Sequence, residues 1–154
     1  MAAASNTVRS LALVAFGALV AACDRGATPT PPETIAKGAP PLAEKAFYRV
    51  DAKPITPCKA GATCEAELVL TALGDYHVND DYPTKFVADA ASEVAIQGEG
   101  TFKIPAAKQG TMTVRFTPAK VGPAKLVGTF RLSVCNEEDC QIESPKITLD
   151  VTSS

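Results

Sequence analysis

Apolar and polar residues alternate along most of the chain beyond residue 46. A period of two places successive side chains on opposite faces of a β-strand, so each alternating run predicts a strand with one buried face. The clearest runs are residues 66–72, 111–117, 125–134 and 147–151, and shorter candidates are residues 47–51, 76–79, 85–88, 93–97 and 101–104. No helical 3.6-residue stripe interrupts them, and turn residues recur between them. The pattern predicts an all-β, immunoglobulin-like antiparallel β-sandwich of about seven to nine strands over residues 46–154.

The amino-terminal segment has a different pattern. Arg9 precedes an unbroken apolar run over residues 11–22, which is shorter than the stretch of about 20 residues that spans a bilayer. The sequence Val-Ala-Ala-Cys at residues 20–23 resembles the lipobox of bacterial lipoproteins. It predicts a signal peptide over residues 1–22 and lipidation of Cys23, with an ordinary secretory peptide as the alternative. We therefore expect a lipid-anchored protein of the bacterial cell envelope that faces the periplasm, with the membrane leaflet left open.

Residues 23–45 show no apolar periodicity and are rich in proline. The prolines of this stretch are Pro29, Pro31, Pro32, Pro40 and Pro41. Such a composition is typical of an extended linker. We therefore expect the lipidated cysteine and a proline-rich linker to precede a single folded domain at residues 46–154.

Charge excludes one class of partner. The chain has 15 Lys and Arg residues against 17 Asp and Glu residues, and no basic stripe carries interleaved aromatic residues. Nucleic-acid-binding domains concentrate positive charge on one face. We therefore expect no nucleic-acid partner.

Four cysteines are left once Cys23 is assigned to the lipid, and they form two close pairs. Cys58 and Cys64 flank a loop of small residues, and Cys135 and Cys140 flank the turn between two predicted strands. Export to an oxidising compartment favours disulfides. Four cysteines permit three pairings, and the sequence does not choose among them, although the short spacings favour local pairs.

Metal sites fit the sequence poorly. The cysteine spacings are wider than those of common zinc knuckles, and a blue-copper site needs two histidines where the chain has one, His77. The acidic run at residues 79–81 lacks the glycine and terminal glutamate of a calcium loop and reads as a turn. Glu99, between two glycines, is likewise expected in an exposed turn. We predict no metal and no cofactor.

The Cys135–Cys140 loop, residues 136–139, contains three carboxylates. Carboxylates disfavour a neighbouring thiolate, so a free thiol there is a poor spontaneous nucleophile. An oxidised pair, however, still accepts attack from the thiolate of another protein. The alternative is a structural clip.

Three stretches carry a family resemblance: residues 74–79 followed by residues 82–86, residues 122–130, and the cysteine hairpin at residues 134–140. Together they resemble the amino-terminal periplasmic domain of DsbD-type thiol–disulfide interchange proteins. The resemblance implies an immunoglobulin-like fold, Cys135 and Cys140 as the exchanging pair, and Tyr76, His77 and Tyr82 as residues that line the hairpin. It also implies a periplasmic or membrane thiol–disulfide protein as the partner. Cys58 and Cys64 match no redox position of that family and are read as a structural bridge.

Two other functional hypotheses stay open. The same sandwich serves equally as a non-enzymatic envelope binding module in which both disulfides are structural. A purely structural envelope lipoprotein without a specific ligand is the third alternative.

Overall fold

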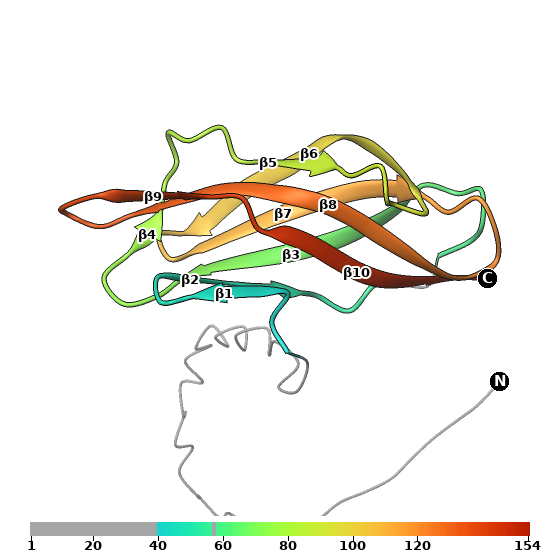
Figure 1. Ribbon diagram of the computed structural model, residues 1–154, viewed down its shortest axis with the longest axis horizontal. Helices are drawn as coiled ribbons and strands as arrows, with labels where there is room; N and C mark the ends of the chain where they lie inside the picture. Colours follow the sequence, from blue (N-terminus) through green and yellow to red (C-terminus); the bar gives the residue numbers. More distant parts are fainter. Residues whose placement is uncertain (1–39, 57) are drawn as a thin grey trace, which may run out of the picture. The chain divides into compact units, whose positions relative to one another are not determined.

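Ten β-strands and no helix make up residues 40–56 and 58–154, the part of the chain that the computed structural model describes (Figure 1). The signal peptide, Cys23 and most of the predicted linker lie outside the described residues. The strands are β1 (Ala43–Lys45), β2 (Tyr48–Ala52), β3 (Cys64–Ala72), β4 (His77–Val78), β5 (Lys85–Ala88), β6 (Ala95–Ala106), β7 (Gln109–Thr117), β8 (Gly122–Cys135), β9 (Cys140–Glu143) and β10 (Lys146–Ser153).

The strands form two antiparallel sheets. One sheet has the order β1-β2-β3-β7-β6, and the other is built around β8. The expected all-β, immunoglobulin-like sandwich is therefore the fold of this domain. Among the described residues, no helix is long and apolar enough to cross a membrane.

Each edge of β8 pairs with two strands in succession. Along one edge it pairs with β9 and then with β10, because Leu132 faces Glu143 and Thr129 faces Lys146 in one continuous register. Along the other edge it pairs with β4 near Cys135 and with β5 near Phe130. Strand β8 on one side and strands β9 and β10 on the other thus form one long hairpin. Its turn carries the Cys135–Cys140 pair.

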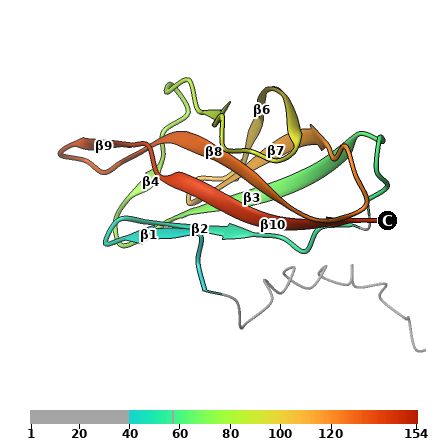
Figure 2. The ribbon, with the colours of Figure 1, turned by 45° about the vertical axis from the view of Figure 1, so that its right-hand side comes forward.

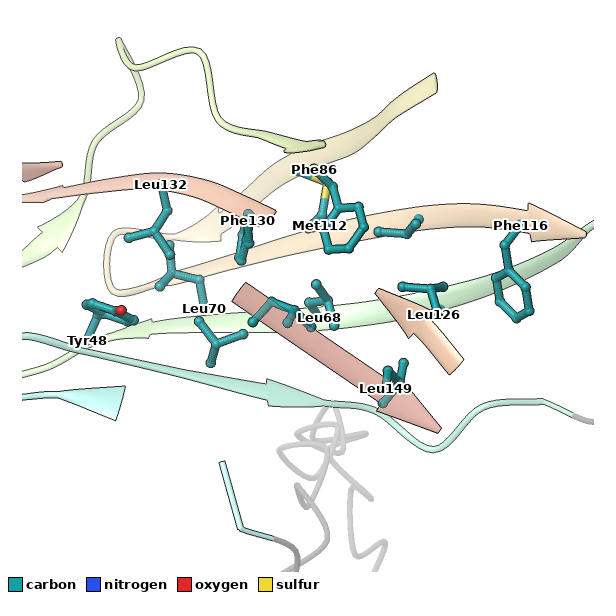
Figure 3. Close-up of a cluster of buried hydrophobic side chains, with 14 of the residues drawn as sticks. Tyr48, Leu68, Leu70, Phe86, Met112, Phe116, Leu126, Phe130, Leu132 and Leu149 are labelled. Atoms are coloured by element: carbon teal, nitrogen blue, oxygen red, sulfur yellow. The ribbon is translucent and has the colours of Figure 1, made fainter. Parts of the chain in front are cut away.

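The core lies between the sheets and follows the predicted alternation. In β8 the inward-facing residues include Leu126, Phe130 and Leu132, which are fully buried. Figure 3 shows them facing side chains of the other sheet, with Tyr48 and Leu132 toward one end of the core and Phe116 toward the other. The side chains of this cluster drawn and labelled are Tyr48, Leu68, Leu70, Phe86, Met112, Phe116, Leu126, Phe130, Leu132 and Leu149. Their burial supplies the main favourable free energy of folding.

Two expectations differ from the structure in detail. Residues 43–45, assigned to the linker, form β1, where the backbone N–H of Leu42 also donates to Val50 (2.8 Å). The strand is too short for a period of two to be visible in the sequence. Residues 95–97 of the candidate 93–97 and all of the candidate 101–104 belong to one strand, β6, and its register shifts between Gln97 and Thr101.

Glu99 lies within this irregular part of β6 and not in a turn between two strands. Both flanking glycines have positive φ, which lets the strand bulge there without a break in its pairing on either side. The carboxylate of Glu99 accepts a hydrogen bond from Lys85 of β5 (2.7 Å), and this ion pair joins the edges of the two sheets. The prediction of an exposed side chain is confirmed, and the prediction of a simple turn is wrong.

Candidate functional site

The turn between β8 and β9 is built by Asn136. Its side-chain oxygen accepts hydrogen bonds from the backbone N–H groups of Glu138 (2.9 Å) and Asp139 (2.8 Å). The backbone N–H of Asn136 donates to the Asp139 carbonyl (2.9 Å). Asparagine favours such turns because its short side chain replaces a backbone acceptor. Residues 136 and 139 are therefore a hydrogen-bonded pair, so the next pair, Cys135 and Cys140, falls where antiparallel strands approach most closely. Their Cα atoms are 4.0 Å apart and the sulfurs are bonded.

The disulfide lies on the outer face of its sheet. Side chains alternate along β8, so the buried core residue Val134 points inward and Cys135 points outward. Directly opposite residues of paired strands share a face, and Cys135 is opposite Cys140 of β9 and His77 of β4. His77, Cys135 and Cys140 thus form one row across three strands.

The next row on this face continues the site. Ser133 lies opposite Ile142 in β9, and the amide nitrogen of the Asn79 side chain donates to the Ser133 hydroxyl (3.2 Å). Ser133 is fully buried, whereas the Ile142 side chain is 64% exposed. An apolar residue therefore projects into solvent directly beside the disulfide and on the same face.

The two cysteines differ in access. Cys135 is only 7% exposed, whereas Cys140 is exposed. Both views of the ribbon show the β8–β9 hairpin extending past the ends of the other strands (Figures 1 and 2). An incoming thiolate therefore reaches Cys140 first, with Cys135 behind it.

The opposite face of the hairpin is held by side chains from β1 and from the turn before β4. The Tyr76 hydroxyl donates to the Asp139 carboxylate (3.3 Å), and the Tyr76 ring packs against Phe47 with centroids 5.6 Å apart. Lys45 forms an ion pair with Glu143 of β9 (2.6 Å). These contacts orient a hairpin that would otherwise project without support.

Negative charge surrounds the turn. Partial burial, the charge of Asp139 and the hydrogen bond to it raise the pKa of Tyr76, with a smaller contribution from Asp75. Burial and the charge of Glu143 raise the pKa of Tyr48. The Asn136 side chain donates to the Asp75 carboxylate (3.5 Å), which ties the turn to the segment before β4. Anionic groups next to a thiol disfavour its thiolate, so a thiolate formed here needs a compensating cation.

Of the residues expected to line the hairpin, the structure brings Tyr76 and His77 to it, on opposite faces. Tyr82 lies in the loop between β4 and β5 and is partly buried. Within the described residues it forms no hydrogen bond or ring contact with the hairpin, so its role there stays a prediction.

Sequence analysis missed Ile142 and Phe47. Ile142 follows Cys140 by two positions, and a period of two would have placed it on the face of the disulfide. Phe47 reaches the hairpin through Tyr76, whose ring it packs against and whose hydroxyl donates to Asp139, and the sequence holds no local signal for this packing.

The other pair, Cys58 and Cys64, is also bonded, with Cα atoms 5.9 Å apart. It lies at the far end of β8, because Cys58 bridges to Ser153, which pairs with Gly122. The Cys58 carbonyl accepts a hydrogen bond from the backbone N–H of Ser154 (2.8 Å). This disulfide therefore holds the carboxyl-terminal strand against the loop that leads into β3.

A groove of about 540 Å³ lies beside the Cys58–Cys64 disulfide. Its lining combines the segment before Cys58 with the carboxyl-terminal half of β10. The lining residues are Lys53, Ile55, Thr56, Cys58, Leu149, Asp150, Val151, Thr152, Ser153 and Ser154. Among residues 40–56 and 58–154, no three His, Cys, Asp or Glu side chains gather where they could hold a metal ion.

Comparison with known proteins adds no functional information. No family model and no curated protein matches this sequence. Similar solved structures include the GAE domain of yeast GGA1 (11% identity, TM-score 0.47, covering 71% of this chain and 96% of that one). A PapD-like domain of human CEP192 is also similar (11% identity, TM-score 0.37, covering 80% of this chain and 98% of that one).

Proposed function

We propose that this domain exchanges disulfides with another protein through Cys135 and Cys140. The observation that carries the proposal is the asymmetry of this pair, with an exposed Cys140 at the end of a projecting hairpin and a buried Cys135 behind it. The resemblance to the DsbD-type amino-terminal domain supports the same assignment. The predicted lipid anchor would hold the domain at the envelope membrane, where a periplasmic or membrane thiol–disulfide protein is the partner.

The exchange proceeds in two steps. A partner thiolate attacks the Sγ atom of Cys140, a mixed disulfide forms, and the electron pair of the broken bond moves to the Sγ atom of Cys135. A second partner thiolate then attacks the partner's own sulfur in the mixed disulfide and releases Cys140. The partner leaves as a disulfide, and the domain holds two thiols. The reverse sequence passes the electrons on to an oxidised protein.

The surface next to Cys140 suits docking of a protein. Ile142 offers exposed apolar area on the same face, and burial of such area stabilises a complex. The carboxylates of Glu137, Glu138 and Asp139 form the rim at the turn. A partner with apolar surface beside its cysteine is therefore favoured.

Two measurements test the proposal. In glutathione redox buffers, the Cys135–Cys140 bond should have a potential above about −300 mV, the range of labile rather than structural disulfides. A Cys135→Ser variant should form a mixed disulfide with glutathione through Cys140, and a Cys140→Ser variant should form far less, because Cys135 is buried. The Cys58→Ser/Cys64→Ser variant is the matched control and should leave the potential unchanged. A potential below about −300 mV with no mixed disulfide in the Cys135→Ser variant would refute the proposal.

The groove beside β10 favours a second candidate, the envelope binding module. β10 is the outermost strand of its sheet, and the groove runs along its carboxyl-terminal half. An extended peptide adds to such an edge through backbone hydrogen bonds. Binding of the domain to an envelope extract that Thr152→Arg, at an exposed residue of the groove, abolishes and that Cys135→Ser/Cys140→Ser leaves intact would support this function over exchange.

A further inference from the structure

The row of side chains that holds the disulfide contains a third member of interest, His77. It is directly opposite Cys135 in the β4–β8 pairing, and both side chains therefore leave the same face of the sheet. The Cβ atoms of such pairs are about 5 Å apart, which brings an imidazole nitrogen within reach of a neighbouring sulfur. His77 is exposed, whereas Cys135 is buried.

The position of His77 matters because of which sulfur leaves. In the proposed exchange, which this inference assumes, the attack falls on Cys140 and negative charge develops on the Cys135 sulfur. That sulfur is poorly exposed to water, and the charged groups on the adjacent segments are mostly acidic. They are Asp75 before β4, Asp80 and Asp81 after it, and Glu137, Glu138 and Asp139 at the hairpin turn.

Cations are scarce on this face near the disulfide. Lys108 reaches the carbonyl of Gly74, and Lys45 is paired with Glu143 on the opposite face of the hairpin. Arg131 shares the outer face of β8, but it lies four residues from Cys135, about 13 Å along the strand. Tyr76, which titrates too, is engaged with Asp139 on the other face. Within the row itself, His77 is the side chain whose ring nitrogens can donate and accept a proton.

We propose that His77 is the proton donor for the departing Cys135 sulfur and, in the reverse direction, the acceptor that returns the Cys135 thiol to its thiolate. When the bond between the two sulfurs breaks, its electron pair goes to Cys135, and the imidazolium proton of His77 passes to that sulfur or stabilises it by a charge-assisted hydrogen bond. When Cys135 attacks the mixed disulfide, the neutral imidazole accepts the same proton. Cys140 remains the group that bonds to the partner.

The test is the rate at which dithiothreitol reduces the Cys135–Cys140 bond, divided by the dithiothreitol thiolate concentration, as a function of pH. In the wild-type protein this normalised rate should fall between about pH 6 and 8, the range in which histidine side chains ordinarily lose their proton. In His77→Gln it should be about tenfold lower at the acidic end and independent of pH across this range, because the proton donor is gone. Arg131→Gln is the matched control for loss of a cation from the same face and should keep the wild-type profile.

A second readout separates a chemical role from a structural one. His77 is the single histidine of the chain, so the protein has one imidazole signal in its NMR spectrum. Reduction of Cys135 and Cys140 should shift the pH midpoint of that signal, and reduction of Cys58 and Cys64 should not. If the wild-type protein exchanges with glutathione but His77→Gln keeps the wild-type reduction rate and its pH profile, the proposed role of His77 is wrong and the proposed exchange function stands. A wild-type disulfide that fails to exchange would overturn the proposed function instead.

Discussion

The two disulfides close loops of nearly equal length and yet lie in opposite surroundings. Cys58 and Cys64 are six positions apart, and Cys135 and Cys140 are five positions apart. The loop-entropy model therefore assigns each bond about the same stabilisation, about 2 kcal/mol. The first bond lies among backbone hydrogen bonds to the carboxyl terminus, and the second lies at the end of a projecting hairpin. Spacing alone does not distinguish a structural bond from an exchanging one, whereas access and neighbours do.

The largest effect is expected at Gly128, midway along β8 between the two disulfides. A Cβ atom there would lie 2.3 Å from the Phe86 ring and 2.7 Å from the Val87 carbonyl. Gly128→Ala should lower the free energy of unfolding by about 1–3 kcal/mol through overpacking. The Cys58–Cys64 bond should then be reduced faster, because unfolding uncovers the buried Cys58 sulfur, whereas the rate at Cys135–Cys140 should not change, because Cys140 is already exposed. Denaturant titration and mass spectrometry of alkylated thiols measure the two quantities. If the reduction of both bonds accelerates equally, the two disulfides do not differ in access as described.

The next effect concerns the structural bond itself. Cys58→Ser/Cys64→Ser should lower the free energy of unfolding by about 2 kcal/mol. Amide hydrogen exchange should accelerate at Ala60, Gly61 and Ser154, whose backbone N–H groups are hydrogen-bonded in this region. Cys135→Ser/Cys140→Ser is the control and should leave those three amides protected. Loss of their protection in the control would show that the two ends of β8 are not independent.

A smaller effect is expected at Ile142, the exposed apolar residue beside the Cys135–Cys140 bond. Ile142→Thr should slow exchange with a cysteine peptide that carries leucines beside its thiol by about fivefold, which corresponds to about 1 kcal/mol of lost apolar burial. Reduction by dithiothreitol should be unchanged, because that reagent makes little contact with the surface. Val121→Thr removes an equally exposed apolar side chain (71%, against 64% for Ile142) away from the hairpin and is the matched control. The same loss of rate in Val121→Thr would argue against docking at Ile142.

The smallest effect should appear at alkaline pH. The pKa of Tyr76 is raised in the folded protein, so the stability it provides is complete below the ordinary tyrosine value of about 10 and is lost as the pH rises through the folded value. Ionised Tyr76 can no longer donate to Asp139. Rapid amide-exchange measurements above about pH 10 should show loosening at the turn but not near Cys58. Tyr76→Phe should have the looser turn already at neutral pH, and an unchanged turn in that variant would contradict this reading.

Much of the fold follows from local pattern. The alternation in residues 125–134 and 147–151 predicts β8 and β10, because one face of each strand must be apolar to pack on the opposite sheet. The cysteine spacing likewise favours a hairpin with a local disulfide between two predicted strands. The short strand β1 and the continuity of β6 through Glu99 were not predictable, since neither shows enough alternating positions. They depend on pairing partners that are distant in the sequence.

The sequence by itself determined that this domain is built of strands and that its cysteines form two close pairs, because both properties depend on residues a few positions apart. Only the tertiary structure decided that His77 lies beside Cys135, that Phe47 and Tyr76 support the opposite face of the hairpin, and that Cys140 is the accessible sulfur. These relations join residues about 30 or 60 positions apart or depend on what covers a side chain. They arise when strand register and sheet packing bring distant residues together, and no local pattern encodes either.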